Sequence, residues 1–153
     1  MGEIRFYHLT ETGLERALPQ LLQVSLSRGW NVCVRFGSEE RAAWMNGHLW
    51  TFSDESFLPH GGPGDPNPEA QPVYLTAGAE TPNSPYALMI ADGADATVEE
   101  LGKYELACVL FDARDGAAMQ AARVKWKEVT GAGLKAVYWK QDGGKWTKAA
   151  ESG

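Results

Sequence analysis

Residues 105–140 read ELACVLFDARDGAAMQAARVKWKEVTGAGLKAVYWK, and this stretch decides the fold. It begins with an apolar run of strand length, 105–112, and ends with a second such run, 134–140. The residues between them, 114–130, are rich in alanine and show helical periodicity. A strand, a helix and a strand in this order predict a parallel crossover, which packs right-handed onto its sheet.

The rest of the chain repeats the alternation of strand-like and helix-like segments. Helices are expected over residues 12–28, from Ser38 to about Trp50, and over 97–103, with Pro19 as a flaw in the first of them. Further strands are expected over residues 3–9, 31–36, 72–78 and 86–91. The pattern predicts a single-domain, three-layer α/β fold with a mostly parallel central sheet and helices on both faces.

The domain boundaries follow from composition. Residues 53–71 hold four of the eight prolines and are expected to form a long loop. The domain is expected to span 1–140, and residues 141–153 are expected to be a flexible C-terminal tail. No internal repeat or second domain is visible in the 153 residues.

Charge is distributed unevenly along the chain. The net charge is −6, which argues against wrapping of bare nucleic acid, because phosphate binding needs clustered Lys and Arg. Residues 114–148 nevertheless hold eight basic and three acidic residues, a net +5, and leave −11 for the remainder. This basic segment is suited to a small anionic partner. The alternative is a solvated helix face followed by a lysine-rich tail.

Two cysteines, Cys33 and Cys108, lie in apolar strand-like runs and are expected to be buried thiols. Their spacing fits neither a zinc site nor a redox motif, and two cysteines do not make a disulfide framework, so a reducing cytoplasmic location is expected. No run approaches the ~18 apolar residues of a membrane span, so no membrane association is expected.

Motifs for catalysis or cofactor binding are absent from the sequence. The glycine-rich residues 60–68 do not join a strand to a helix and have no Lys-Ser/Thr after them, so they do not match a phosphate-binding loop. The histidines lack metal-ligand spacing, and no serine lies in a nucleophile elbow. We therefore expect no metal, no cofactor and no catalytic residue. The alternative is a small α/β nucleotide- or substrate-binding enzyme with its site at the carboxyl ends of the strands.

The helix over 114–130 carries the candidate binding residues. A helical wheel places Ala117, Ala118, Ala121, Ala122, Val124 and Val129 in one arc, which is expected to face the sheet. Trp126 lies away from this arc with Arg123, Lys127 and Thr130, whereas Lys125 lies near the arc and has to extend its amine to solvent. An aromatic ring between two cations can hold an apolar side chain and pair a carboxylate. The alternative is a tryptophan packed flat on a neighbouring loop.

Six segments of the sequence resemble those of a known protein family. They are residues 4–10 (IRFYHLT), 14–22 (LERALPQLL), 28–35 (RGWNVCVR), 38–41 (SEER), 49–60 (LWTFSDESFLPH) and 121–128 (AARVKWKE). Together they resemble the chi subunit of bacterial DNA polymerase III holoenzyme, over roughly residues 3–140. The block 49–60 and the basic-aromatic helix are the most specific pieces, since an α/β frame alone would match many folds.

The resemblance implies a noncatalytic adaptor with a Rossmann-like fold and no working nucleotide site. Chi proteins join the psi subunit of the clamp loader and bind the acidic C-terminal tail of single-stranded DNA-binding protein, so contact with DNA is only indirect. Arg123, Trp126 and Lys127 match the family's tail-binding helix. Trp126 departs from the aromatic commonly found there, and its ring lacks a hydroxyl.

A second surface is also implied by the resemblance. Trp50, Phe57, Leu58, Pro59 and His60 resemble the segment that contacts psi. Aromatic and proline residues in a loop are plausible interface anchors, and they are equally plausible as packing that closes the edge of the sheet. Because psi is poorly preserved across bacteria, a repair helicase is an alternative partner for this surface.

Overall fold

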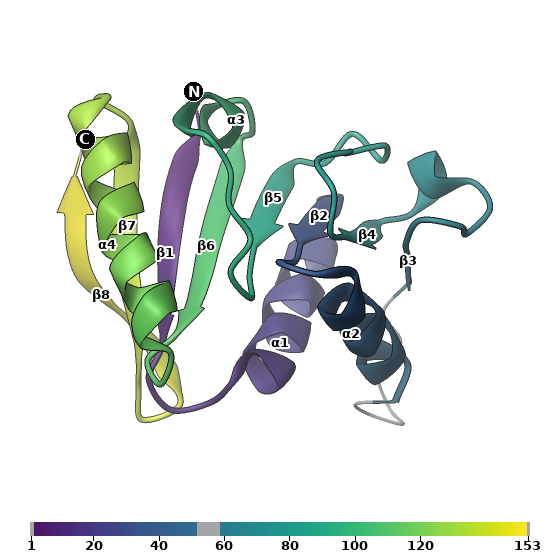
Figure 1. Ribbon diagram of the computed structural model, residues 1–153, viewed down its shortest axis with the longest axis horizontal. Coiled ribbons are helices and arrows are strands. Elements are labelled where there is room, and N and C mark those ends of the chain that lie inside the picture. The colour runs from purple at the N-terminus through teal and green to yellow at the C-terminus, as the bar shows by residue number, and fades with distance from the viewer. Residues whose placement is uncertain (1, 52–58, 153) are drawn as a thin grey trace.

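The computed structural model describes residues 2–51 and 59–152, and the elements alternate much as predicted (Figure 1). The helices are α1 (Leu14–Ser27), α2 (Glu39–Thr51), α3 (Val98–Gly102) and α4 (Gly116–Gly131), with a short 3-10 turn, η1 (Pro68–Ala70). The strands are β1 (Glu3–Leu9), β2 (Val32–Arg35), β3 (His60–Gly61), β4 (Val73–Thr76), β5 (Ala87–Ile90), β6 (Leu106–Asp112), β7 (Lys135–Asp142) and β8 (Lys145–Ser152).

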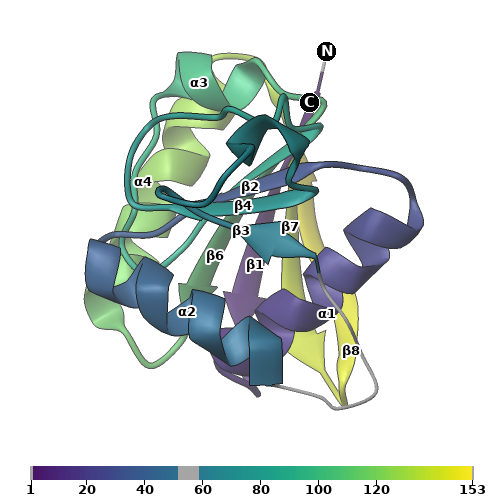
Figure 2. The same ribbon diagram turned by 90° about the vertical axis from the view of Figure 1, so that its right-hand side faces the viewer.

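The strands form one sheet in the order β3-β4-β2-β5-β6-β1-β7-β8, parallel throughout except for β8, which pairs antiparallel with β7. Figure 2 shows α1 and α4 on opposite sides of this sheet. Core residues of α1 and α2 pack together on one face, and those of α3 and α4 on the other. The predicted three-layer α/β class is therefore confirmed.

The two cores share the strands by simple alternation of side chains. In β6, Leu106, Cys108 and Leu110 belong to the core under α1 and α2. The intervening Ala107, Val109 and Phe111 belong to the core under α3 and α4. A strand buried on both faces needs an unbroken apolar run, which is the pattern that predicted it. Cys33 and Cys108 are buried free thiols, as expected.

The C-terminal segment differs from its expectation. The last strand continues to Asp142, and residues 145–152 are β8 of the sheet, so the predicted flexible tail over 141–153 is wrong for this part. Gly143 and Gly144 form the turn with φ of 62° and 81°, the left-handed conformation of a tight two-residue hairpin. This glycine pair between two strand-length segments was the signal for a hairpin.

The remaining differences lie in the long loop between α2 and β4. Residues 60–61 and 68–70 form β3 and η1, and part of the predicted loop, residues 52–58, lies outside the described residues. None of the helices in the described part of the chain combines the length and apolar character that a membrane crossing requires.

Candidate binding groove on helix α4

Helix α4 is held at its N-terminus by Asp115. The Asp115 carboxylate accepts hydrogen bonds from the backbone N–H groups of Ala117 and Ala118, both at 3.1 Å, which satisfies two donors that have no partner within the helix. Ala122 and Val129 are buried against the sheet. The short side chain of Ala122 lets the helix lie close to the strands, and this fixes the direction in which its other faces point.

The predicted sheet-facing arc is only partly correct. Ala122 and Val129 are buried, but Ala117 and Ala121 are exposed and Val124 is 48% exposed. Lys125 takes the inward position instead and is 8% exposed. The helix is therefore rotated about its axis by a fraction of a turn relative to the orientation that the wheel predicts. The wheel did not predict this rotation, because the partner of Lys125 lies in a distant loop that the wheel does not include.

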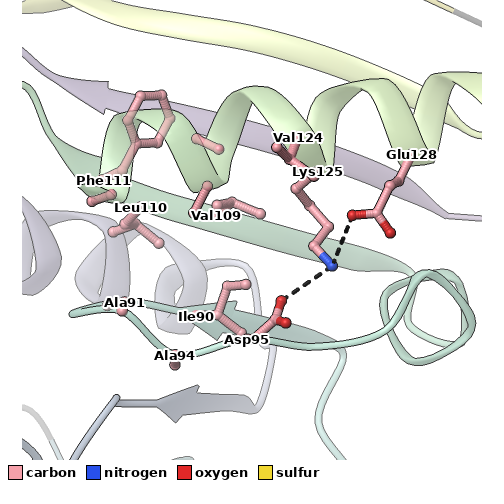
Figure 3. Close-up of a pocket in the computed structure, with 14 residues that line it drawn as sticks. Ile90, Ala91, Ala94, Asp95, Val109, Leu110, Phe111, Val124, Lys125 and Glu128 are labelled. Atoms are coloured by element: carbon pink, nitrogen blue, oxygen red, sulfur yellow. Dashed lines mark ion pairs between the residues drawn. The ribbon is translucent and has the colours of Figure 1, made fainter. Parts of the chain in front are cut away.

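Lys125 does not extend to solvent as expected but ties α4 to the loop before α3. Its Nζ donates to the carbonyl oxygen of Ala96 at 2.7 Å. The same atom lies 3.1 Å from Asp95 and 3.7 Å from Glu128, the two ion pairs drawn in Figure 3. Burial acts to raise the pKa of the Asp95 carboxyl, but the hydrogen bonds from Lys125 and from the backbone N–H of Ala96, together with the charges of Lys125 and Arg35, outweigh it, so that pKa lies below its ordinary value. The positive charge of Lys125 is therefore used inside the domain and is not offered to a partner.

Trp126 lies at the boundary between the core and a groove. Its ring forms T-shaped pairs with the rings of Phe6 and Tyr138. The ring centroids are 5.2 Å and 5.9 Å apart, respectively. The expectation that Trp126 points away from the core is thus half right, since part of the ring packs on the core of the α3–α4 face. Packing of this kind holds the ring still, which suits a binding platform.

The groove runs along α4 beside β7 and β8 and has a volume of about 460 Å³. Its lining residues are His8, Phe111, Met119, Ala122, Arg123, Trp126, Lys127, Tyr138, Ala149 and Ala150. Arg123 and Lys127 are both exposed. Neither forms an ion pair with any other described residue. The predicted trio of Arg123, Trp126 and Lys127 therefore comes together around a largely aromatic cavity.

The floor of this groove contains residues that were not predicted. Tyr138 and His8 are joined by a hydrogen bond of 2.9 Å between the tyrosine hydroxyl and the ring Nδ1, and His8 stacks on Phe111 at 4.8 Å. Burial, and then the charge of Lys140, lower the pKa of His8, so the ring is neutral at neutral pH. Tyr138 brings a hydroxyl to the groove, the group that Trp126 lacks.

Thr130 takes no part in this groove. Its hydroxyl donates back to the carbonyl oxygens of Trp126 at 2.8 Å and Lys127 at 3.3 Å within the helix, a common arrangement for threonine in a helix. The residue lies one turn beyond Trp126 and does not line the cavity.

The second predicted surface lies at the other end of the sheet, beside β3 (Figure 1). Trp50 is 55% exposed at the end of α2, and its ring lies 4.3 Å from that of His60. His60 is buried, with Nε2 3.0 Å from the carbonyl oxygen of Asn46, and so serves the packing of β3 on α2. Pro59 is half-buried, and Phe57 and Leu58 lie outside the described residues.

A small cavity lies at the carboxyl ends of β1, β5 and β6. It measures about 90 Å³, against about 300–1,000 Å³ for ordinary ligand sites, and a second cavity of about 360 Å³ lies between the ends of β5 and β6 and helix α4. The smaller cavity is lined by four carboxylates, Glu15, Asp92, Asp112 and Asp115, and by one cation, Arg41, so its net negative charge does not favour an anion. Within the described residues there is no group of three or more side chains that could hold a metal ion.

Comparisons with known proteins show the family of the chain. The family model described as DNA polymerase III chi subunit, HolC, matches residues 1–137, from β1 into β7. A Rickettsia prowazekii (strain Madrid E) protein named "Probable DNA polymerase III subunit chi" is 27% identical over 95 residues, which cover 62% of this chain and 58% of that protein. The match thus spans less than two thirds of the relative. With 137 of 153 residues matched, the chain belongs to the chi subunit family of DNA polymerase III.

Proposed function

We propose that this protein is a noncatalytic adaptor that links the clamp loader of DNA polymerase III to single-stranded DNA-binding protein by holding that protein's acidic C-terminal tail in the α4 groove. The observation that carries the proposal is the pair of exposed cations, Arg123 and Lys127, on the rim of a cavity lined by aromatic rings. Contact with DNA is then indirect, in keeping with the net charge of −6.

The two parts of the groove suit the two parts of such a tail. Arg123 and Lys127 lie one helical turn apart on the same face, so both can reach carboxylates at the end of one peptide. Phe111, Trp126 and Tyr138 offer ring surfaces to an apolar terminal side chain. Burial of an aromatic side chain contributes about 1.5–3 kcal/mol, whereas an exposed ion pair contributes about 0.2–1 kcal/mol. The rings therefore supply most of the affinity, and the cations supply the selection for a carboxylate.

The function can be tested by titrating a fluorescently labelled acidic peptide ending in Pro-Phe into the full chain. We expect Arg123→Ala and Lys127→Ala each to weaken binding about two- to fivefold, and the double variant more, because each removes an exposed ion pair. Added salt should weaken wild-type binding, since exposed charges are screened. Lys103→Ala, which removes an exposed lysine at the end of α3, is the matched control and should bind as the wild type does.

Binding that is the same in the wild type and the Arg123→Ala, Lys127→Ala double variant would contradict the assignment of the groove. Absence of binding to the wild type would contradict the tail as the ligand.

We further propose that the surface around Trp50 docks the psi subunit of the clamp loader, or a repair helicase where psi is absent. Trp50 is exposed at the edge of the sheet opposite the groove, so the two partners would not collide. Trp50→Ala should abolish co-purification with the purified partner and leave binding of the tail peptide unchanged. Retained co-purification would exclude this surface.

A further inference from the structure

Strand β8 forms one wall of the α4 groove. Ala149 and Ala150 lie on this strand and line the cavity across from Arg123 and Trp126 of the helix. The family match ends at residue 137, so this wall is made by a part of the chain to which the match does not extend. The groove is thus built from matched residues on α4, β1 and β6 and from unmatched residues on β7 and β8.

The wall is held in place from outside the groove. The rings of Trp146 of β8 and Tyr7 form a T-shaped pair with 4.9 Å between their centroids, on the face of the sheet that carries α1. The turn before β8 is fixed by Glu11, whose carboxylate accepts the N–H groups of Gly143 at 3.0 Å and Gly144 at 2.9 Å. None of these contacts uses a groove residue, so β8 keeps its position without a ligand.

A shift in register brings two neighbouring alanines to the groove. Trp139 pairs with Lys148 and Tyr138 with Ala150, which leaves Ala149 as an extra residue between the two pairs. Neighbouring side chains in a regular strand point to opposite faces, whereas a bulge re-aims one of them. Ala149 and Ala150 can therefore both line the groove, and each contributes only a methyl group.

We propose that β8 determines which C-terminal residue the groove accepts, with Ala149 and Ala150 leaving the room that an aromatic ring needs. This rests on the proposed function, since the ligand is an acidic peptide with a free carboxylate next to its last side chain. A ring placed against these methyl groups meets the rings of Phe111, Trp126 and Tyr138 in the same cavity. Aromatic pairs favour edge-to-face contact, which Trp126 and Tyr138 already show with each other.

The test compares two peptides that differ only in the last residue, Phe or Ala, on three full-length proteins. The wild type should prefer the Phe peptide by at least about tenfold, the effect of burying a ring. Ala150→Trp places a ring in the cavity and should remove this preference by weakening the Phe peptide alone. The Ala peptide should bind this variant as it binds the wild type, which also shows that the variant is folded. Thr147→Trp adds the same bulk to β8 at a residue that does not line the groove, and should keep the preference.

Each outcome has one meaning. The role of β8 would be overturned if Ala150→Trp kept the preference for the Phe peptide. It would also be overturned if Thr147→Trp lost this preference as fully as Ala150→Trp does. Equal weakening of both peptides in Ala150→Trp would also overturn it, because the wall would then act on the carboxylate site or on folding. If the wild type binds neither peptide, the proposed function itself fails.

Discussion

Pro19 leaves one carbonyl of α1 without its helical partner, and a histidine from another helix supplies the missing donor. Proline has no N–H, so the carbonyl of Glu15, four residues earlier, cannot form its usual bond. His48 of α2 places Nε2 at 2.7 Å from that oxygen. A carbonyl oxygen can only accept, so the ring nitrogen is the donor here. The flaw noted in the sequence is thus also a point of attachment between α1 and α2.

A double-mutant cycle tests this attachment. His48→Phe keeps a ring on Trp44, which His48 stacks on, but removes the donor and should cost about 1 kcal/mol of unfolding free energy. In the Pro19→Ala background the new N–H can satisfy Glu15, so the same substitution should cost less. Urea denaturation of the four proteins measures both costs. Equal costs in the two backgrounds would contradict the role given to His48.

At the same scale, the sequence predicted Arg123, Trp126 and Lys127 because helical spacing is a local property. It did not predict the inward position of Lys125, because the Ala96 carbonyl that holds its amine is 29 residues away in the chain. His8 and Tyr138 were missed for the same reason, since their strands are neighbours only in the folded sheet.

Among the elements, α3 shows how a short helix can be held by charge. Glu100 accepts from the N–H of Thr97 at 3.0 Å, and Thr97 accepts from the N–H of Glu100 at 3.1 Å, a capping box. The other carboxylate oxygen of Glu100 pairs with the buried Arg35 at 3.0 Å. The Thr97 hydrogen bond, and next the Arg35 hydrogen bond, lower the pKa of Glu100 from its ordinary value of 4.5.

This gives a pH-dependent prediction for Glu100→Gln. The glutamine can still accept from Thr97, so the variant removes mainly the charge that faces Arg35. Because folding lowers the pKa of Glu100, its contribution to stability is complete above pH 4.5 and is lost as the pH falls through the folded value. The variant should therefore be less stable than the wild type at pH 7 and equal to it at strongly acidic pH. Urea midpoints across this range measure the difference, and a constant difference would contradict the account.

The element boundaries were predictable where the pattern of apolar residues is clear, as an unbroken run in β6 and as periodic spacing in β1 and α4. Strand β8 was not predicted, because its exposed face is polar and charged and it resembles a solvated tail. Lys145, Lys148 and Glu151 are typical of an edge strand protected against pairing with other chains. Strand β3 has only two residues, too few for any periodic pattern.

For the whole molecule, the two cysteines report on both core layers. Cys33 lies in the core of the α3–α4 face and Cys108 in the core of the α1–α2 face. Burial raises the pKa of each thiol to about 12, so neither forms a thiolate near neutral pH. A thiol reagent at pH 8 should therefore label neither cysteine in the native state and both after unfolding in urea, at matching rates. Fast labelling of one cysteine alone would show that the layers open separately.

The arrangement of the whole chain suits an adaptor. The α4 groove lies beside β7 and β8 at one end of the sheet, and the Trp50 surface lies beside β3 at the other. The three-layer class followed from the alternation of segments, but the strand order, which separates these two surfaces, depends on long-range pairing that one sequence does not display.

The most direct test of the central claim is an NMR titration of the ¹⁵N-labelled full chain with an unlabelled acidic peptide ending in Pro-Phe. The account predicts that the largest shifts occur at the amides of Arg123 and Lys127, the indole N–H of Trp126, and the amides of Tyr138 and Ala150. Shifts centred instead on α2, or on the carboxyl ends of β1, β5 and β6, would contradict the α4 groove as the binding site.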